Sequence, residues 1–404
     1  MKPERRAEVE ETLYFTQTFE GEVRELIFNV DLCNGCKICV YACPTNAIEF
    51  AGIEALAAGM PLIVDHLRCA FCGICYAFCP FHAFEFRVDG KIPELPLQLG
   101  GEIQKLESCV DCMLCVKACP VQAIEHKILK RREDFPETDA RGKIKVDAEK
   151  CNFCGICAAF CDAFKLVEKE VTPKSPKPFS DLLIYEEKCD YCGLCVDICP
   201  EKAIEVESTK PVVAEVGRVA EVTFTERCIH CGYCVAVCPY EAVKNVKPFE
   251  GEIKVFWSRL ARVCDAVSCK ACVTVCKPKA WHLNGELKLN PDFCIYCGAC
   301  ENVCHLNLIE VTRRAKVVQN FEWAGWQKAV ERINAKKVVE EVSWFSFTSP
   351  PVQEVVENKK VGKLEKLDLG AIREALKKPG YRKAFEVGDV KKFLSAVRRY
   401  AKKT

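Results

Sequence analysis

Cysteines at a fixed spacing are the residues of this sequence that could do chemistry. The pattern C-x2-C-x2-C-x3-C occurs seven times and the variant C-x4-C-x2-C-x3-C once, so that eight motifs account for all 32 cysteines. Each iron of a cubane iron–sulfur cluster needs one soft, negatively charged ligand, which a thiolate supplies. The spacing therefore predicts bacterial-type 4Fe–4S ligation. The motifs begin at Cys33, Cys69, Cys109, Cys151, Cys189, Cys228, Cys264 (the variant) and Cys294.

The spacing also predicts how each loop is built. Thiolates at i, i+3 and i+6 let a tight loop hold three corners of one cluster, and glycine helps the backbone approach because it has no Cβ. Glycine follows the second cysteine in five motifs, as in Gly73 and Gly155. We expect the fourth cysteine to start a short helical turn, where a proline fits. Proline follows it directly as Pro44, Pro80, Pro120, Pro200 and Pro239.

Three motifs depart from the proline rule without losing a ligand. Pro278 is displaced by one residue in the seventh motif, Asp162 stands in the fourth, and His305 stands in the eighth. We still expect a cluster at each of them. His230 and His305 lie among the cysteines but complete no ligand set that lacks a member, so we expect them to pack or to hydrogen-bond rather than bind iron.

Disulfides and zinc are the two alternatives for so many cysteines. The N-terminus is charged and lacks the apolar segment of a secretory signal, and no stretch approaches the ~18 consecutive apolar residues of a membrane span. We therefore expect a reducing cytoplasm, where disulfides are rare. Structural zinc sites usually combine two separated cysteine pairs, unlike these consecutive short gaps.

In two-cluster ferredoxins the fourth cysteine of one motif binds the cluster of the other, so the motifs should work in pairs. The step between motif starts is shortest between the seventh and eighth, 30 residues, which favours pairing in sequence order. The sequence leaves open a nested arrangement, with one ferredoxin unit inserted between the halves of another. Consecutive pairing predicts eight ligand sets: Cys33, Cys36, Cys39 and Cys79; Cys69, Cys72, Cys75 and Cys43; Cys109, Cys112, Cys115 and Cys161; Cys151, Cys154, Cys157 and Cys119; Cys189, Cys192, Cys195 and Cys238; Cys228, Cys231, Cys234 and Cys199; Cys264, Cys269, Cys272 and Cys304; and Cys294, Cys297, Cys300 and Cys276.

The flanks of the motifs indicate the elements that position them. Strand-like segments such as KIKV and EVTF precede several motifs, and short apolar segments such as AIEF and AIEV follow several. We therefore predict an α+β fold, a tandem array of four bacterial-type two-cluster ferredoxin domains with a basic helical C-terminal tail. The expected parts are an N-terminal extension (1–26), four ferredoxin domains (27–100, 101–175, 176–250 and 251–312) and the tail (313–404).

The near-zero total charge hides an asymmetry. Residues 311–404 carry 22 Lys and Arg against 11 Asp and Glu, a net of +11, while the remainder carries a net of −10. Apolar residues at helical spacing in 323–342 and 389–403 predict helices in the tail. No nucleic-acid motif accompanies the charge, so we expect the tail to dock on the acidic body or on a partner protein.

The motifs indicate an electron relay rather than a catalyst. Every expected cluster has four cysteine ligands, and the chain has no GxGxxG, Walker A or zincin motif, so we predict no catalytic residues. Eight one-electron centres on one chain make a wire or a store. The order of their potentials depends on hydrogen bonds to sulfur, charge and exposure.

The eightfold motif, with stretches such as CAFCGICYAFCPFHAF, resembles the polyferredoxin subunit of archaeal formylmethanofuran dehydrogenases over residues 25–312. That resemblance implies eight 4Fe–4S clusters that relay electrons to or from a tungsten- or molybdenum-pterin subunit, where CO2 and formate interconvert. It also implies protein partners in a redox complex and a ferredoxin or similar carrier. The basic tail departs from the family. The alternatives are a polyferredoxin of a hydrogenase or heterodisulfide reductase assembly, a free electron store, and an enzyme in which one cluster is catalytic.

Overall fold

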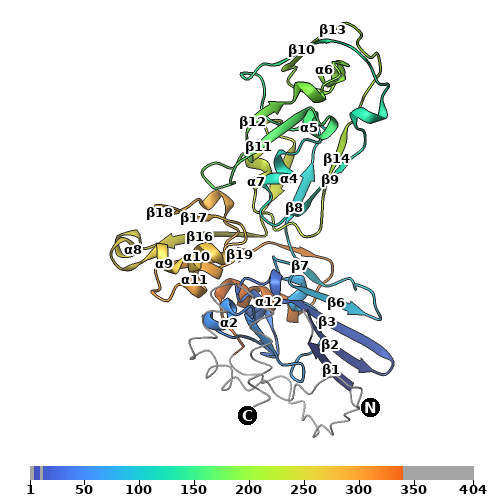
Figure 1. Cartoon of the computed structure of the whole chain (residues 1–404). Coiled ribbons are helices and arrows are strands. Elements are labelled where there is room, and N and C mark those ends of the chain that lie inside the picture. Colours follow the sequence, from blue (N-terminus) through green and yellow to red (C-terminus); the bar gives the residue numbers. More distant parts are fainter. Residues whose placement is uncertain (1–3, 10–11, 340–404) are drawn as a thin grey trace, which may run out of the picture. The chain divides into compact units, whose positions relative to one another are not determined.

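The computed structural model describes residues 4–9 and 12–339, and the predicted tail helix at 389–403 lies outside them. Contacts divide the chain into two compact units (Figure 1). Of the described residues, the first unit comprises 4–9, 12–79, 83–95 and 323–339, and the second comprises 80–82 and 96–322. None of the described helices is long and apolar enough to cross a membrane.

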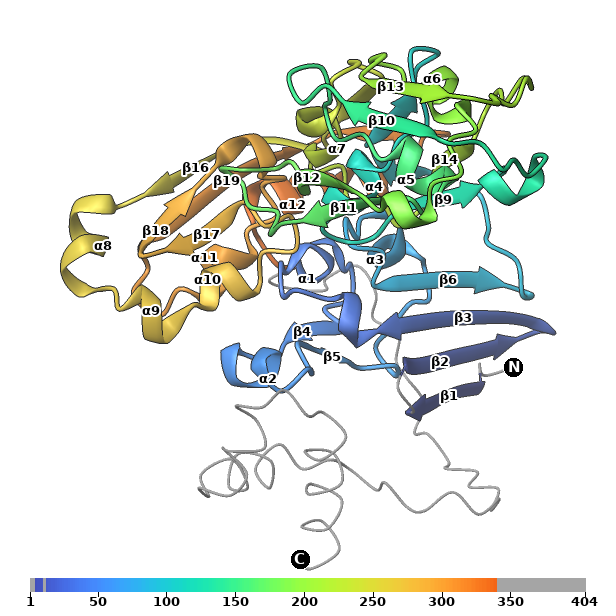
Figure 2. The same ribbon diagram turned by 45° about the horizontal axis from the view of Figure 1, so that its top comes forward.

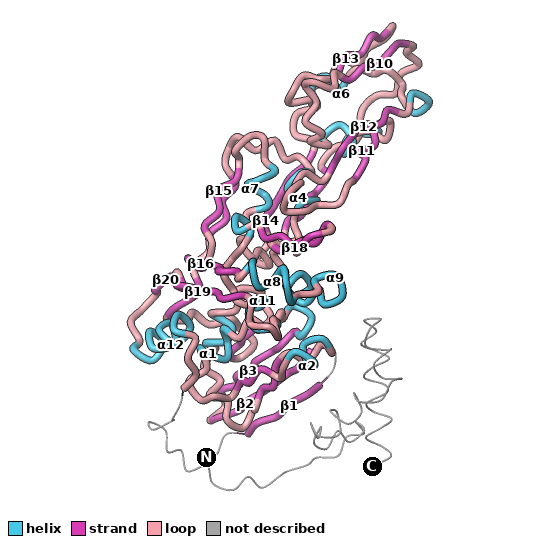
Figure 3. Tube along the Cα trace, turned by 90° about the vertical axis from the view of Figure 1, so that its left-hand side faces the viewer, coloured by secondary structure: helices cyan, strands magenta, loops and turns pink. Residues whose placement is uncertain are grey.

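One local unit recurs at every motif: a strand, a cysteine loop, a short helix, a turn and a second strand. Figure 3 shows how short the helices are relative to the loops between them. The fourth cysteine lies at the C-terminal end of the helix, as Cys43 does in α1, so the expectation that it starts a helical turn is wrong. Pro44 instead lies in the turn that follows. The motif helices are α1 (Ile38–Ala42), α3 (Ile74–Ala77), α4 (Leu114–Ala118), α5 (Ile156–Phe160), α6 (Leu194–Ile198), α7 (Tyr233–Val237), α9 (Ala266–Cys269), α10 (Ala271–Thr274) and α11 (Ala299–Val303).

The first unit joins motifs one and two. The strand before motif one, β3, pairs with the strand after motif two, β6, and the two inner strands, β4 and β5, pair with each other, all antiparallel. Two further strands extend the outer sheet in the order β1-β2-β3-β6. The elements are β1 (Glu4–Val9), β2 (Thr12–Phe19), β3 (Glu22–Asn29), a 3-10 turn (Val30–Leu32), β4 (Ile48–Phe50), α2 (Ile53–Ala57), β5 (Leu62–Val64) and β6 (Phe84–Val88).

The start of the tail forms α12 (Ala324–Ala335), which packs on α1 within the first unit. Trp326, Ala329 and Ile333 repeat at helical spacing and are buried. The ring of Trp326 lies 6.2 Å from that of Phe78, centroid to centroid. This part of the tail is therefore held on the first unit by an apolar stripe.

Motifs four and five form a compact module within the second unit. The strands that flank the pair, β10 and β13, are antiparallel partners, and so are the inner strands β11 and β12 (Figure 1). The elements are β10 (Gly142–Val146), β11 (Phe164–Glu168), β12 (Phe179–Ile184), a 3-10 turn (Glu186–Lys188) and β13 (Ile204–Ser208).

Motifs three and six pair around that module. Strand β9, after motif three, pairs with β14, before motif six, and β8 pairs with β15. Consecutive pairing is therefore wrong for motifs three to six, and the expected boundaries 101–175 and 176–250 each cut across two modules. The nested order depends on contacts between residues about a hundred positions apart, which local patterns do not report. The elements are β8 (Glu102–Lys105), β9 (Ile124–Ile128), a 3-10 turn (Arg132–Asp134), β14 (Ala220–Phe224) and β15 (Val243–Val246).

Motifs seven and eight pair with each other, as their short separation predicts. Strand β16 pairs with β19, and β17 pairs with β18 across Gly285. An additional helix, α8, precedes motif seven, and β7 pairs with β20 beside the module. The elements are β7 (Leu97–Leu99), β16 (Phe249–Val255), α8 (Trp257–Val263), β17 (Trp281–Asn284), β18 (Glu286–Leu289), a 3-10 turn (Pro291–Phe293), β19 (Ile309–Ala315) and β20 (Val317–Gln319).

Candidate iron–sulfur sites

Seven of the eight cysteine loops have a left-handed residue two positions after the first cysteine; motif seven, with its longer gap, is the exception. The left-handed residue turns a backbone N–H toward that cysteine: Phe71 N donates to Cys69 Sγ at 3.4 Å, and Tyr296 N donates to Cys294 Sγ at 3.3 Å. Gly73 supplies a second left-handed position, with φ +76°, and a Cβ there would lie 2.6 Å from a ring carbon of Phe86. The left-handed residues are Gly35, Phe71, Asp111, Phe153, Tyr191, His230 and Tyr296.

The fourth cysteine accepts a backbone hydrogen bond in seven motifs. The N–H four residues further on donates to its sulfur at 3.2–3.4 Å, as Ala47 does to Cys43. Motif four differs because β11 begins only three residues after Cys161, and Phe164 N donates to the carbonyl oxygen of Cys161. N–H groups aimed at sulfur favour the thiolate form and tune the potential of a bound cluster.

One cavity shows which cysteines face each other. It measures about 370 Å³, counting space open to solvent, and it is lined by Cys151, Cys154 and Cys157 from motif four and by Cys199 from motif five. Leu166, Leu182 and Ile204 complete an apolar wall. Three thiols from one motif and the fourth cysteine of its partner are the donor set that a 4Fe–4S cluster needs. The residues that line this cavity therefore fit a 4Fe–4S cluster.

The other motifs show the same arrangement: the fourth cysteine of one motif lies close enough to act electrostatically on the thiols of its partner motif. Cys112 and Cys115 lie beside Cys238, and Cys231 and Cys234 lie beside Cys119. Cys195 lies beside Cys161. The fourth cysteines that lie beside motifs three, four, five and six are thus Cys238, Cys199, Cys161 and Cys119, where consecutive pairing places Cys161, Cys119, Cys238 and Cys199.

Motifs one, two, seven and eight have the neighbours that consecutive pairing predicts. Cys39 lies beside Cys79, and Cys72 and Cys75 lie beside Cys43. In the last module, Cys264 and Cys272 lie beside Cys304, and Cys276 lies beside Cys294 and Cys297.

Burial makes these thiols weak acids on their own. Desolvation, with a further contribution from neighbouring cysteines, raises the pKa of Cys112, Cys115 and Cys154 to about 12 and that of Cys72 to about 11. Gathered thiols therefore keep their protons unless a positively charged centre binds among them, since a coordinating thiol is deprotonated outright. All 32 cysteines lie in the described residues, and none forms a disulfide. Among these residues no three His, Cys, Asp or Glu side chains converge closely enough to bind a single metal ion.

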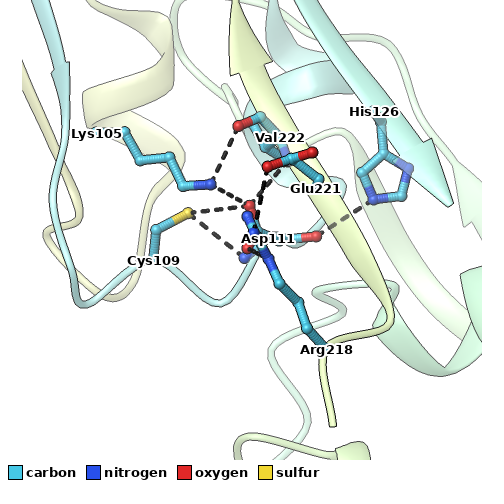
Figure 4. A network of polar contacts seen from close by, with 7 residues as sticks. All are labelled: Lys105, Cys109, Asp111, His126, Arg218, Glu221 and Val222. Carbon is cyan, nitrogen blue, oxygen red and sulfur yellow. Dashed lines mark hydrogen bonds and ion pairs between the residues drawn. The ribbon is translucent and has the colours of Figure 1, made fainter. Parts of the chain in front are cut away.

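A buried carboxylate ties motif three to the strand before motif six (Figure 4). Asp111, 5% exposed, lies between Cys109 and Cys112, and its Oδ1 accepts from Val222 N at 2.8 Å. Arg218 Nε donates to Oδ2 at 2.7 Å, and Lys105 Nζ donates to Oδ1. Burial alone would raise the pKa of Asp111, but these hydrogen bonds outweigh it and hold the pKa below its ordinary value. Sequence reasoning did not single out Asp111; its position among the cysteines is the only local signal.

A cation from α12 lies beside the ligands of the first unit. Arg332 is half-buried and donates to Tyr41 O at 3.0 Å and to Ala42 O at 2.9 Å, the carbonyls just before Cys43. Desolvation lowers the pKa of Arg332, and the nearby Cys43 opposes that shift. The tail sequence predicts a helix here but no particular contact, so this residue also had no signal in the sequence.

The fold and the cysteine geometry define an iron–sulfur protein, and the comparisons with known proteins agree. The 4Fe-4S dicluster domain matches residues 32–87, 108–163 and 188–242, and a second dicluster domain family matches residues 61–120. A 4Fe-4S binding domain matches residues 287–304. Each dicluster match spans two sequence-adjacent motifs; it reports their presence, while the strand pairing determines which motifs share a module.

An uncharacterised ferredoxin of Methanocaldococcus jannaschii is 33% identical over 51 residues, which make up 12% of this chain and 82% of that protein. The chain therefore belongs to the 4Fe–4S ferredoxin family. It is of the polyferredoxin type, an electron-transfer protein with tandem cluster-binding domains.

Among solved structures, a chain of the formate dehydrogenase–heterodisulfide reductase–formylmethanofuran dehydrogenase complex from Methanospirillum hungatei has the same fold. The TM-score is 0.56 at 23% identity, and the match covers 83% of this chain and 92% of that chain.

Proposed function

We propose that the chain carries eight 4Fe–4S clusters and relays electrons within a redox complex. The observation that carries this proposal is the cavity lined by Cys151, Cys154, Cys157 and Cys199, because it combines a full ligand set with an apolar wall. When bound, such clusters supply one-electron transfer at potentials set by hydrogen bonds, charge and solvent access. The chain's own residues hold the clusters, exclude water and donate N–H groups to sulfur.

The ligand sets combine the three closely spaced cysteines of each motif with the fourth cysteine of the motif that shares its strands. For motifs one, two, seven and eight these are the sets predicted above. For the nested modules they are Cys109, Cys112, Cys115 and Cys238; Cys228, Cys231, Cys234 and Cys119; Cys151, Cys154, Cys157 and Cys199; and Cys189, Cys192, Cys195 and Cys161.

The partner that we propose is a tungsten- or molybdenum-pterin subunit of a formylmethanofuran dehydrogenase, working in a reducing cytoplasm. Two observations support this choice: the resemblance of the eightfold motif, and the fold shared with a chain of a formate dehydrogenase–heterodisulfide reductase–formylmethanofuran dehydrogenase complex. The chain would then be the wire between the pterin site and a soluble electron carrier. It contributes no catalytic residue of its own.

Anaerobic purification with quantification of iron and of companion proteins tests the proposal. We expect about 32 iron atoms and as many acid-labile sulfides per chain, four of each per cluster. A co-purifying pterin protein with tungsten or molybdenum supports the assignment, and a nickel–iron hydrogenase or a lone chain overturns it. Iron well below this value, or turnover by the isolated chain, would overturn the relay itself.

A further inference from the structure

Motif seven is the least enclosed of the eight motifs. Cys269 is the one exposed cysteine among all 32, every one of which is described, and the other motifs have only buried or half-buried cysteines. The cause is local: the longer C-x4-C gap places Cys269 at the end of α9, a one-turn helix on the surface of the module. Figures 1 and 2 both show α8 and α9 next to each other at one end of the last ferredoxin module. An electron could therefore enter or leave the chain with least intervening protein at this motif.

The same segment presents apolar side chains to solvent. Trp257 is 45% exposed, Val263 is 52% exposed and Val267 is 62% exposed, all within eleven residues of the chain. On the inner side, Leu260 of α8 is buried against the core of the module, and the ring of Trp257 lies 6.1 Å from that of Trp281, centroid to centroid. The exposed apolar side chains thus lie on two helices, α8 and α9, each of which has a residue, Leu260 or Ala266, packed in the core of the module.

Charge distinguishes this segment from the other seven motifs. Counted from seven residues before the first cysteine to fifteen after it, motif seven has five basic residues and one acidic residue, a net of +4. The same window has a net charge between −3 and 0 at every other motif. Arg259, Arg262 and Lys270 are exposed. A basic rim around apolar anchors attracts and orients a partner of opposite charge.

We propose that residues 257–270 form the docking surface for an acidic one-electron carrier protein of the ferredoxin type. This inference rests on the proposed relay function and locates one of its two ends. The occupant follows from the two features together: the exposed ligand requires a redox partner, and the basic rim selects an acidic one. Exchange here transfers one electron from the reduced carrier to an oxidised cluster, or back.

The test uses the anaerobic holoprotein and an acidic two-cluster ferredoxin as the probe. The variant is Arg259→Glu with Arg262→Glu, which reverses the charge of the rim without touching a cysteine. The matched control is Lys202→Glu with Arg227→Glu, the same charge change at exposed residues beside motifs five and six. Glutamate suits position 202, since Glu241 occupies the equivalent left-handed position in motif six.

Two readouts are compared: affinity for the oxidised ferredoxin by calorimetry, and the rate of reduction by reduced ferredoxin in stopped flow at several salt concentrations. We expect the rim variant to lose at least tenfold in both at low salt and to show a flatter salt dependence. The control should stay within twofold of the wild type. Val267→Ser should weaken binding more than Val213→Ser, a 98% exposed valine elsewhere.

Equal effects of the rim and control variants would overturn the docking surface. Dithionite, a small reductant that needs no docking, separates this outcome from failure of the relay: it should reduce all variants equally. If neither dithionite nor ferredoxin reduces the wild type, the proposed function itself fails. If charge reversal lowers the iron content of the protein, the neutral double variant Arg259→Gln with Arg262→Gln replaces it in the same measurements. We expect this variant to lose affinity for ferredoxin to an intermediate degree.

Discussion

At the scale of single residues, the fourth cysteine of a motif could share a cluster with the sequence-adjacent motif or with the motif that shares its strands. Alkylation of the thiols that become accessible in a variant distinguishes the two arrangements. In Cys199→Ser we expect Cys151, Cys154 and Cys157 to become reactive to alkylation, because the variant removes the fourth thiolate of their proposed cluster while nearly preserving the shape of the cavity. The cysteines of motif five itself should stay protected. Mass spectrometry after anaerobic alkylation measures this directly.

The control for that alkylation experiment is Cys119→Ser. With consecutive pairing, Cys119→Ser would make Cys151, Cys154 and Cys157 reactive to alkylation. The position of Cys119 beside Cys231 instead predicts that the cysteines of motif six become reactive. If Cys119→Ser exposes motif four instead, the nested ligand sets are wrong.

Asp111 is the side chain that joins motif three to motif six, so its removal should loosen both. Asp111→Ala leaves the buried Val222 N–H without its acceptor and should lower the free energy of unfolding by about 1–3 kcal/mol. Urea unfolding under anaerobic conditions measures the loss. Asp139→Ala serves as a control, since its ion pair with Lys210 is exposed and worth about 0–1 kcal/mol.

The pH dependence of that difference follows from the lowered pKa of Asp111. A carboxyl with a depressed folded-state pKa contributes stability above its unfolded pKa, ~3.9, and loses it as pH falls through the folded pKa. Between about pH 5 and 8 the difference between wild type and Asp111→Ala should therefore stay constant. A difference that vanishes within this range would contradict the ion pair.

Arg332 places a positive charge beside Cys43, the proposed fourth ligand of the second cluster. Positive charge favours the reduced, more negative state of a cluster, so Arg332→Gln should lower the reduction potential of that cluster alone. A redox titration followed by electron paramagnetic resonance measures the shift. Arg332→Lys keeps the charge and should largely restore the potential, whereas equal shifts in both variants would indicate lost packing of α12 rather than lost charge.

At the scale of elements, the sequence predicts the local units well. The segments KIKV and EVTF lie in β10 and β14, AIEV lies at β13, and residues 323–342 contain α12, because strand and helix patterns are local properties. The nested order was not predictable in the same way. It depends on Arg218, Lys105 and Val222 meeting at Asp111, and nothing in the spacing of the motifs distinguishes this from consecutive order.

In the candidate sites, too, the features that depend on local sequence were predictable and those that depend on long-range contacts were not. Spacing predicts that all 32 cysteines are ligands, but the fourth cysteine that lies beside motifs three to six differs from the one expected, because this neighbour follows the strand pairing. Asp111 and Arg332 were missed because a carboxylate in a cysteine loop and an arginine in a basic helix are both common on solvated surfaces.

Nesting makes the inner module separable, which gives a prediction about elements. The ends of the insertion meet: Arg141 N donates to Thr209 Oγ1 at 3.0 Å, and Thr209 N donates to Arg141 O at 3.0 Å. A fragment of residues 140–210 should therefore fold alone around two clusters, about eight irons after reconstitution. Residues 101–175, cut at the boundary expected from consecutive pairing, should not hold two clusters. Iron content and circular dichroism compare the two; the reverse result would exclude the nested fold.

At the scale of the whole molecule, the described residues bury apolar side chains in several separate cores, and the largest of these is shared by motifs three to six. Buried apolar residues gather in separate clusters that each include cysteines, as Cys157 and Cys195 do in one of them. Modules of this size rarely hold together on apolar burial alone, and metal ligation supplies the missing stability. With disulfides absent, the iron–sulfur clusters should be the main covalent cross-links.

Removal of iron should therefore unfold the modules rather than leave a stable apoprotein. We expect that chelation with mild oxidation will abolish the cooperative thermal transition of the described body and make its thiols titratable, because freed thiols buried at pKa values near 12 cannot replace the lost ligation. Calorimetry before and after iron removal, with a reductant present afterwards to prevent disulfides, measures the effect. An apoprotein that keeps its melting temperature would show that the apolar cores suffice. The most resistant part should be the first unit, since its four-stranded sheet and α12 bury apolar residues such as Leu26, Phe28 and Ile333 in addition to the cysteine motifs.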